Sequence, residues 1–179
     1  QENVRILKER GVHFAGPAEG RMASGLSGFG RMLEPDEIIG HTRGVLGLRA
    51  KLAGKKIVIT AGGTREPIDP VRFISNRSSG KQGYALAQAA IDMGADVRLI
   101  SAPTALTPPI GANLILAQTA EEMLDAVLTE SAGADALIMA AAIADFRPAE
   151  TASKKLKKRD GIPQITLEAA PDVLKAVAS

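Results

Sequence analysis

Four short segments rich in aliphatic residues constrain the fold of this chain more than any other feature. Each has the length and composition of a β-strand that is buried on both faces. The segments are Ile57–Ile59, Asp96–Ser101, Leu114–Leu116 and Ala136–Met139. All of them lie after Gly54, so we expect the folded core in this part of the chain.

Two stretches between these segments have the apolar spacing of an α-helix. The first runs from about Gly83 to Met93, and Gly94 is placed to end it. The second starts at Thr119, because Thr119 and Glu122 match a capping box. Strands that alternate with helices in this way form parallel sheets with right-handed crossovers. The sequence therefore predicts an α/β protein with a three-layer Rossmann-like fold and a mainly parallel sheet.

The chain before the first strand has a different composition. Residues 1–37 open with a short helical or strand-like piece and then become rich in glycine, which predicts a mobile loop. From Asp36 to Ala53 the aliphatic spacing indicates a helix interrupted at Gly44 and Gly47. The expected organisation is an appendage over residues 1–37, a linker over residues 38–54 and the α/β domain over residues 55–179.

Composition excludes several kinds of protein. The chain contains no Cys, which excludes disulfides, thiolate zinc sites and covalent Cys chemistry and fits a cytoplasmic location. No apolar run approaches the roughly 20 residues that a membrane span needs. A formal charge of +2 and only one Tyr and four Phe give little support for nucleic-acid binding. His13 and His41 lack an evident carboxylate partner, so hydrolase and zinc-enzyme functions are not favoured.

Ligands of an open parallel sheet bind at the carboxyl ends of its strands, which directs attention to two loops. After the first strand, Gly62 and Gly63 let a ligand approach the backbone, and a long Pro-containing loop follows. It leads to Ser78–Lys81, directly before a helix amino end, where backbone N–H groups and the helix dipole would favour a phosphate. A Ser-capped turn with a solvent-facing Lys81 explains these four residues equally well.

The fourth strand ends in the small residues Ala140–Ala142, against which a flat base or ribose would fit. Asp145 would bind a hydroxyl group or Mg²⁺, although a loop-capping role is the alternative. The basic cluster Lys154–Arg159 follows, and such a cluster is usually a solvated surface. Its position after the strand end instead favours a flexible lid whose lysine reaches a triphosphate. From Ala149 onwards we expect this Lys-rich loop, then an extended segment Ile165–Leu167 and a helix beginning near Pro171.

The glycine spacing after the first strand does not match the usual dinucleotide fingerprint. The acidic residue expected at the end of the second strand is also missing, because Ser101 and Ala102 stand there. An NAD(P)-dependent oxidoreductase is therefore the less favoured enzyme. A non-enzymatic nucleotide-binding or RNA-binding module that uses the Lys cluster remains the other alternative.

Several motifs in order resemble the phosphopantothenoylcysteine synthetase family, found in bacterial bifunctional coenzyme A biosynthesis flavoproteins. The motifs are Thr60–Asp69, Val71–Lys81, Ala140–Pro148 and Lys155–Lys158. The appendage is similar to the carboxyl tail of the decarboxylase flavoprotein that precedes the synthetase in such fusions. That similarity rests on Gly16–Pro17, Met22–Gly25, Gly28–Met32 and Glu34–Pro35.

The resemblance implies a two-step ligation in coenzyme A synthesis. The carboxylate of phosphopantothenate attacks the α-phosphate of CTP, pyrophosphate leaves, and the amine of cysteine then displaces CMP from the acyl cytidylate. Lys155 would assist the first step, whereas Asn76 and Arg72 would bind phosphopantothenate and support turnover of the intermediate. Mg²⁺ should accompany the triphosphate, although no metal ligands are identified. The nucleotide site expected from the strand ends and the motif match comprises Gly62, Gly63, Thr64, Ser78, Ser79, Gly80, Lys81, Ala140, Ala141, Ala142, Ile143, Asp145, Phe146, Lys155, Lys158 and Asp172.

The resemblance also sets limits on this chain. FMN would bind only in the decarboxylase body, which lies upstream, so the chain itself should not decarboxylate. Ser24 stands where some decarboxylases have Cys. Members of the synthetase family continue beyond the position of Ser179, so the C-terminal part of the fold is expected to be incomplete. A homodimer through the synthetase domain is implied, with a higher oligomer in the full-length protein.

Overall fold

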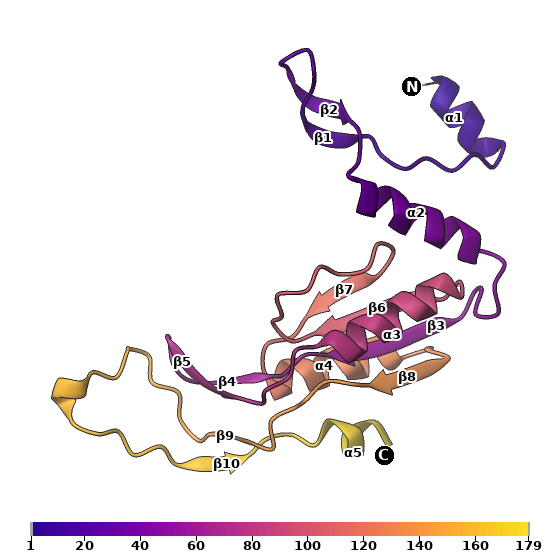
Figure 1. Cartoon of the computed structure of the whole chain (residues 1–179). Helices are drawn as coiled ribbons and strands as arrows, with labels where there is room; N and C mark the ends of the chain where they lie inside the picture. The colour runs from indigo at the N-terminus through magenta and orange to yellow at the C-terminus, as the bar shows by residue number, and fades with distance from the viewer. Residues whose placement is uncertain (1, 179) are drawn as a thin grey trace.

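The computed structural model of the chain describes residues 2–178 and has a four-stranded parallel sheet at its centre. The strands follow the order β7-β6-β3-β8, so β3 lies between two neighbours (Figure 1). Their bounds are β3 (Lys56–Ala61), β6 (Asp96–Ser101), β7 (Asn113–Leu116) and β8 (Ala136–Met139). All four correspond to the aliphatic segments that the sequence analysis assigned to strands.

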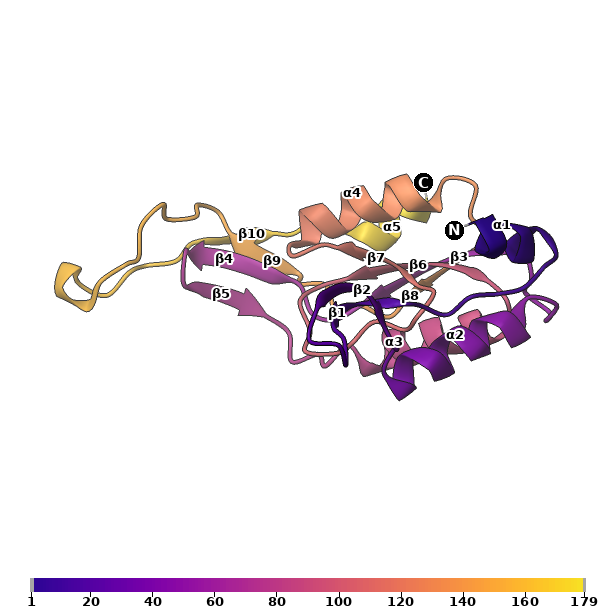
Figure 2. The ribbon, with the colours of Figure 1, turned by 90° about the horizontal axis from the view of Figure 1, so that it is seen from above.

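Helices cover both faces of this sheet (Figure 2). One face carries α3 (Lys81–Asp92), with α2 (Pro35–Gly47) packed on its outer side. The other face carries α4 (Ala120–Ser131), which contacts the short helix α5 (Val173–Ala178). The predicted three-layer α/β fold with a mainly parallel sheet is confirmed.

The sheet has a separate apolar core on each face, and β3 contributes to both. Ile57 and Ile59 pack toward α3, whereas Val58 belongs to the cluster that includes Met123 of α4. Val58, Ile59 and Met123 have no exposed surface. Burial of alternate side chains on opposite faces explains why β3 is an almost continuous aliphatic run.

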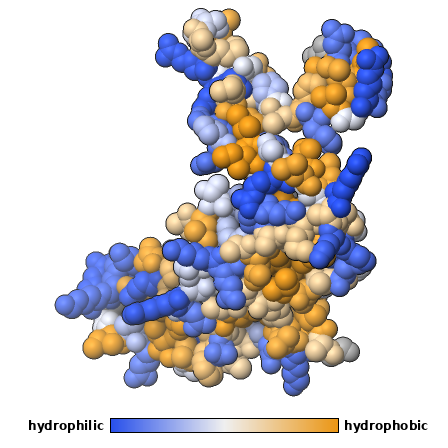
Figure 3. Space-filling model, turned by 45° about the vertical axis from the view of Figure 1, so that its right-hand side comes forward, coloured by the Kyte–Doolittle hydropathy of each residue, from blue (hydrophilic) through white to orange (hydrophobic). Residues whose placement is uncertain are grey.

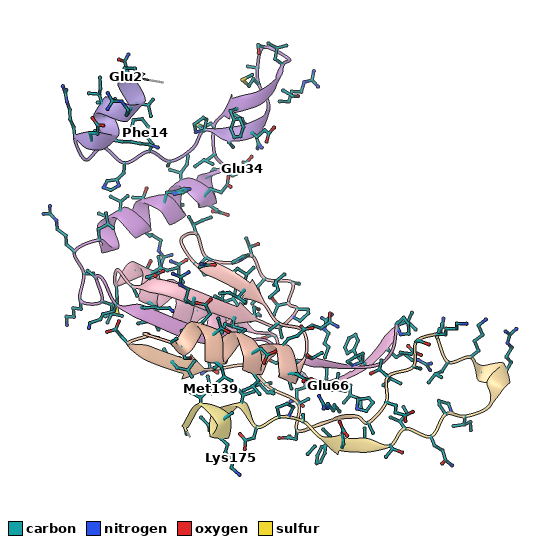
Figure 4. All side chains as sticks on the ribbon, turned by 180° about the vertical axis from the view of Figure 1, so that it is seen from behind. Glu2, Phe14, Glu34, Glu66, Met139 and Lys175 are labelled. Carbon is teal, nitrogen blue, oxygen red and sulfur yellow. The ribbon has the colours of Figure 1, made fainter. Side chains whose placement is uncertain are left out.

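The amino end of α4 has the predicted cap and an additional one. The Thr119 hydroxyl accepts a hydrogen bond from the Glu122 N–H at 3.2 Å, and the Glu122 carboxylate accepts from the Thr119 N–H. The buried Glu66 carboxylate also accepts a hydrogen bond from the Ala120 N–H at 2.9 Å, and Glu66 lies beside the start of α4 in Figure 4. A negative charge at this position interacts favourably with the helix dipole.

The glycine-rich part of the first segment is not the loop that its composition predicted. After α1 (Glu2–Glu9), the strands β1 (Ala18–Arg21) and β2 (Ser27–Arg31) form an antiparallel hairpin with Glu19 opposite Phe29. Glycine disfavours strands on entropic grounds, but backbone pairing along the whole hairpin overrides that preference. Apolar patches lie on the surface of the molecule (Figure 3), and Phe29 of this hairpin is 76% exposed.

The helix α2 differs from the predicted interrupted helix. It runs without a break through Gly44 and ends at Gly47, whereas residues 49–54 form turns. At Gly47 a side-chain carbon would lie 2.7 Å from the Ile91 carbonyl oxygen, so this glycine permits close packing of α2 on α3. Gly47 therefore serves helix packing, and Gly44 does not break the helix.

Two antiparallel pairs stand where loops were expected. Within the long Pro-containing loop, β4 (Arg65–Asp69) pairs with β5 (Arg72–Ser75). Proline is tolerated in such a pair because it is an isolated edge hairpin, outside the main sheet. Further along, β9 (Phe146–Pro148) pairs with β10 (Leu167–Ala169), so the extended segment lies about two residues later than predicted.

The described helices are too short or too polar to cross a membrane.

Candidate functional site

The loops that follow β3 and β8 are joined at the carboxyl edge of the sheet. Gly63 and Ala142 form an isolated parallel bridge. The Ala142 N–H donates to the Gly62 carbonyl oxygen at 2.7 Å, and the Thr64 N–H donates to the Ala142 carbonyl oxygen at 3.3 Å. The structure therefore brings together two loops that the sequence analysis assigned to the nucleotide site.

Two buried threonines from the β3 side hold the backbone of the β8 loop. The Thr60 hydroxyl accepts hydrogen bonds from the N–H groups of Ala140 and Ala141, both at 3.1 Å. The Thr64 hydroxyl accepts from the Ala144 N–H at 2.9 Å. These N–H groups already have protein partners, so a bound base would meet the small Ala side chains and not these donors.

Asn76 links the end of the β4–β5 hairpin to the same loop. Its side-chain amide donates to the carbonyl oxygens of Ile143, at 3.1 Å, and Ala142, at 3.4 Å. At Gly63 a side-chain carbon would lie 2.8 Å from the Asn76 carbonyl oxygen, so the two backbones are in close contact. Asn76 thus contacts both strand-end loops.

The segment Ser78–Lys81 forms a serine-stabilised turn before α3. The Ser78 hydroxyl accepts from the Gly80 N–H at 3.4 Å, and the Ser79 hydroxyl accepts from the Lys81 N–H at 3.5 Å. Gly80 has a φ of +75°, and a side chain there would also meet the Cα of Gly62 at 3.4 Å. Local capping therefore occurs at this turn, which at the same time lies against the loop after β3.

The third loop of the edge follows β6 and is tied to α3 through the only tyrosine. The Tyr84 hydroxyl lies 3.1 Å from the Ser101 hydroxyl, and the Thr104 hydroxyl donates to it at 3.2 Å. A cavity of about 380 Å³ opens beside this group and extends to Leu116 and Gln118. The carboxyl ends of β3, β6 and β8 therefore form one continuous edge next to a cavity.

The basic segment lies apart from this edge. Residues 149–166 project with the β4–β5 hairpin to one side of the sheet (Figures 1 and 2). Lys155 and Lys158 are exposed, and within residues 2–178 no hydrogen bond or ion pair joins them to the loop after β3. A cavity of about 480 Å³ lies inside this projection, and its lining includes Ile68, Leu156 and Thr166. The lining contains no residue of the strand-end loops, so this cavity is separate from them.

Arg72, expected at the substrate site, is engaged by a buried carboxylate in the hairpin turn. Its guanidinium donates to the Asp69 carboxylate from Nε at 3.0 Å and from Nη2 at 2.5 Å. The Asp69 side chain has no exposed surface, whereas that of Arg72 is 45% exposed. Hydrogen bonds from the Arg72 guanidinium, together with those from backbone N–H groups, hold the pKa of Asp69 well below its ordinary value.

Three other predicted site residues lie at or beyond the end of the β8 loop. Asp145 and Phe146 are exposed, and the Asp145 carbonyl oxygen accepts a hydrogen bond from the Ala170 N–H at 2.9 Å. The Asp172 carboxylate accepts from the Lys175 N–H at 2.9 Å, which caps α5. Among the described residues no group of three or more His, Cys, Asp or Glu side chains forms a metal site.

Sequence reasoning gave no role to three buried polar residues that shape this region. Thr60 holds the β8 loop, Glu66 caps α4, and Asp69 organises the hairpin turn. A local signal existed for Asp69, because Asp before Pro favours a turn closed by its own side chain. Thr60 and Glu66 had no such signal, since their partners are 80 and 54 residues away.

Known proteins provide an independent comparison. Over 181 residues the chain is 46% identical to the coenzyme A biosynthesis bifunctional protein CoaBC of Vibrio vulnificus, covering 100% of this chain and 45% of that protein. The chain thus spans less than half the length of this curated relative. A crystal structure of the C-terminal domain of CoaBC is 45% identical, with a TM-score of 0.62 over 70% of this chain and 59% of that one.

A more distant structure, a Cab2 mutant in complex with phosphopantothenate-cysteine, has a TM-score of 0.59 at 20% identity. That likeness covers 69% of this chain and 59% of the other, and it shows the fold alone. Residues 52–179 match the family described as the DNA/pantothenate metabolism flavoprotein C-terminal domain. This match covers the whole α/β domain with its joined strand-end loops, so the chain belongs to the DNA/pantothenate metabolism flavoprotein C-terminal domain family.

Proposed function

We propose that this chain forms part of a coenzyme A biosynthesis ligase that joins phosphopantothenate to cysteine at the expense of CTP. The observation that carries the proposal is the junction of the Gly62–Thr64 loop, Asn76 and the Ala140–Ala144 loop at the carboxyl edge of a parallel sheet. This is the edge at which α/β folds bind nucleotides. The α/β domain belongs to a family of pantothenate metabolism proteins, which supports the substrate class.

The shape of the edge suits a cytidine nucleotide. Ala141 and Ala142 offer a flat surface without large side chains, and their N–H groups are already bonded within the protein. The turn at Ser78–Gly80 and the first turn of α3 lie next to the Gly62–Gly63 loop. The amino end of α3 carries the positive end of the helix dipole, which would favour a phosphate next to this turn.

Lys155 and Asn76 would act in different steps of the reaction. In the first step the carboxylate of phosphopantothenate attacks the α-phosphate of CTP, forming an acyl cytidylate and releasing pyrophosphate. Lys155 would neutralise the charge that develops on the phosphate during this attack. In the second step the amine of cysteine displaces CMP, and Asn76, with Arg72, would hold the pantothenate part of the intermediate.

The names of related proteins support the overall reaction. The Vibrio vulnificus relative is named for coenzyme A biosynthesis, and the Cab2 mutant is described in complex with phosphopantothenate-cysteine. Mg²⁺ as a companion of CTP, a homodimer formed through this domain and a cytoplasmic location remain predictions. A decarboxylase activity that requires FMN is proposed only for a full-length protein that carries this chain.

A kinetic comparison of two variants in such a full-length protein tests the proposal. Lys155→Gln should greatly slow formation of the acyl cytidylate and leave a measurable residual rate, with Lys154→Gln as the matched control one position earlier. Asn76→Asp should let the intermediate form and accumulate, because Asn76 is assigned to the second step and a carboxylate cannot donate to the carbonyl oxygens of Ala142 and Ile143. Quench-flow analysis with radiolabelled CTP separates the two steps.

Calorimetric titration with CTP, NADPH and a short RNA separates the proposed ligase from the two alternatives. CTP should bind, and NADPH should not compete with it. Tight RNA binding with a steep dependence on salt and no preference for CTP would contradict the ligase. NADPH binding that excludes CTP would favour the oxidoreductase.

A further inference from the structure

The basic segment is fixed to the β4–β5 hairpin at two points on either side of Lys155. Near its start the Thr151 hydroxyl donates to the Pro67 carbonyl oxygen at 3.0 Å, and the Ala152 N–H donates to that of Ile68, also at 3.0 Å. The second point is Leu156, and only residues 153–155 lie between the two. The backbone of Lys155 is thereby held to a short span beside the hairpin.

The second point is built around the buried Asp69 carboxylate. Its Oδ2 accepts a hydrogen bond from the Leu156 N–H at 3.1 Å, and the Arg72 guanidinium donates to the Leu156 carbonyl oxygen at 2.8 Å. Since Arg72 also pairs with Oδ2, the three residues form a closed ring of hydrogen bonds. The remaining oxygen, Oδ1, accepts from the N–H groups of Val71 and Arg72, both at 2.9 Å, and closes the hairpin turn.

This arrangement joins two parts of the chain that are 87 residues apart through one side chain. A carboxylate without exposed surface is stable only when it is paired and fully hydrogen-bonded, and Asp69 meets both conditions. The hairpin that carries Asp69 ends at Ser75 and leads directly to Asn76 at the strand-end loops. The same element therefore contacts the nucleotide edge at one end and the basic segment at the other.

We propose that Asp69 is a positioning residue that sets the location of Lys155 by holding the Leu156 backbone against the β4–β5 hairpin. This inference rests on the proposed function, because Lys155 is the group whose charge acts on the phosphate. The contacts of the Asp69 carboxylate are with Val71, Arg72 and Leu156, and not with the strand-end loops. Its effect on the reaction passes through Lys155, and a misplacement of about 1 Å in such a group lowers a rate by up to about a hundredfold.

Asp69→Asn separates the two functions of the carboxylate. An amide oxygen in the place of Oδ1 still accepts from Val71 and Arg72 and keeps the turn, whereas the amide NH₂ in the place of Oδ2 faces the Leu156 N–H and the Arg72 guanidinium. Leu156→Pro is the second variant, because it removes the N–H donor from the basic segment and leaves the hairpin unchanged. The control is Asp135→Asn, which breaks a carboxylate pair with Lys55 at the opposite edge of the sheet, where the Asp135 side chain is 38% exposed.

The first readout does not depend on catalysis. In the full-length protein, trypsin should cut after Lys157, Lys158 and Arg159, the bonds that Leu156→Pro leaves unchanged, several times faster in Asp69→Asn and in Leu156→Pro than in the wild type or in Asp135→Asn. Mass spectrometry of the early fragments identifies the cut sites. Cutting at the wild-type rate in both variants would overturn the proposal, whatever the ligase assay shows.

The second readout is a double-mutant cycle on acyl-cytidylate formation. Asp69→Asn alone should slow this step about tenfold to a hundredfold with little change in CTP affinity. In the Lys155→Gln background it should cause no further loss, because its effect acts through Lys155. If the double mutant loses rate by the product of the two single losses, Asp69 has a general structural role that is independent of Lys155, and the inference is overturned. Full activity of Lys155→Gln would instead reject the proposed role of Lys155, and the trypsin result would still decide whether Asp69 holds the segment.

Discussion

The Thr64 hydroxyl accepts a hydrogen bond from the Ala144 N–H at 2.9 Å, and both residues are buried at the carboxyl edge of the sheet. The bond joins the loops after β3 and β8 across 80 residues of sequence. The shape of the proposed cytidine surface thus depends on a side chain that belongs to the opposite loop.

Thr64→Val tests this dependence. Valine has nearly the same shape but leaves the Ala144 N–H without an acceptor, which costs about 1–3 kcal/mol in a buried position. We expect a lower melting temperature and weaker CTP binding in calorimetry, whereas Thr64→Ser, which keeps the hydroxyl, should retain both. Equal CTP affinity for the two variants would show that the hydrogen bond between Thr64 and Ala144 does not contribute to nucleotide binding.

A pair of helix glycines provides a second prediction, about stability. In α3 a side-chain carbon at Gly83 would lie 2.5 Å from the Cβ of Ala61 and 2.8 Å from the Thr60 carbonyl oxygen. Gly83→Ala should therefore force α3 away from β3 and destabilise the fold by about 2 kcal/mol. In α2 a side-chain carbon at Gly44 would have no atom within 4 Å. Gly44→Ala should therefore stabilise the fold by about 0.5–1 kcal/mol, because it lowers the conformational entropy of the unfolded chain.

Urea unfolding of the two variants under identical conditions measures the difference. Both changes add the same methyl group to a helix, in the first turn of α3 at Gly83 and in the interior of α2 at Gly44, so helix propensity alone predicts stabilisation in each case. Opposite signs would show that the contact of Gly83 with β3 decides the outcome. Stabilisation by Gly83→Ala would contradict the close packing of α3 on β3.

The parallel sheet could be predicted because its signal is local. Strands such as Lys56–Ala61 are buried on both faces, so they appear in the sequence as aliphatic runs of the right length. The capping box at Thr119 was equally local, since Thr119 and Glu122 are only three residues apart. The parallel order then placed the Gly62 and Ala142 loops at one edge, which the bridge between Gly63 and Ala142 confirms.

The β1–β2 and β4–β5 hairpins could not be predicted, because they depend on the pairing of two strands and not on the composition of either strand. The β4–β5 segment contains Pro67 and does not alternate regularly between polar and apolar residues, and its turn is closed by the Asp69 side chain. The glycine-rich β1–β2 pair has little strand propensity of its own. Within the site, Asn76 was assigned by resemblance. Its hydrogen bond to Ile143 joins residues that are 67 positions apart, and no local sequence pattern predicts such a contact.

The ion pair between Arg43 of α2 and Asp92 of α3 gives a prediction about pH. The Asp92 carboxylate accepts from Arg43 Nε at 2.9 Å and from the Gln88 amide at 2.9 Å, and Arg43 Nη2 forms a further short contact. The Arg43 guanidinium is the main cause that lowers the pKa of Asp92 below its ordinary value of 3.8, and the Gln88 amide adds to the effect.

A carboxyl group whose pKa is lower in the folded state contributes stability above its unfolded pKa and loses that contribution as the pH falls. The Asp92 contribution should therefore be complete at neutral pH and decline below about pH 4, the region of the unfolded value. Asp92→Asn should lower the melting temperature by a few degrees at pH 7, and the difference from wild type should shrink toward pH 3. High salt should shrink it as well, because the Asp92 side chain is 32% exposed and the pair is screened. Melting curves of both proteins between pH 3 and pH 7 measure this, and a difference that stays constant across the range would show that the charge of Asp92 does not hold α2 on α3.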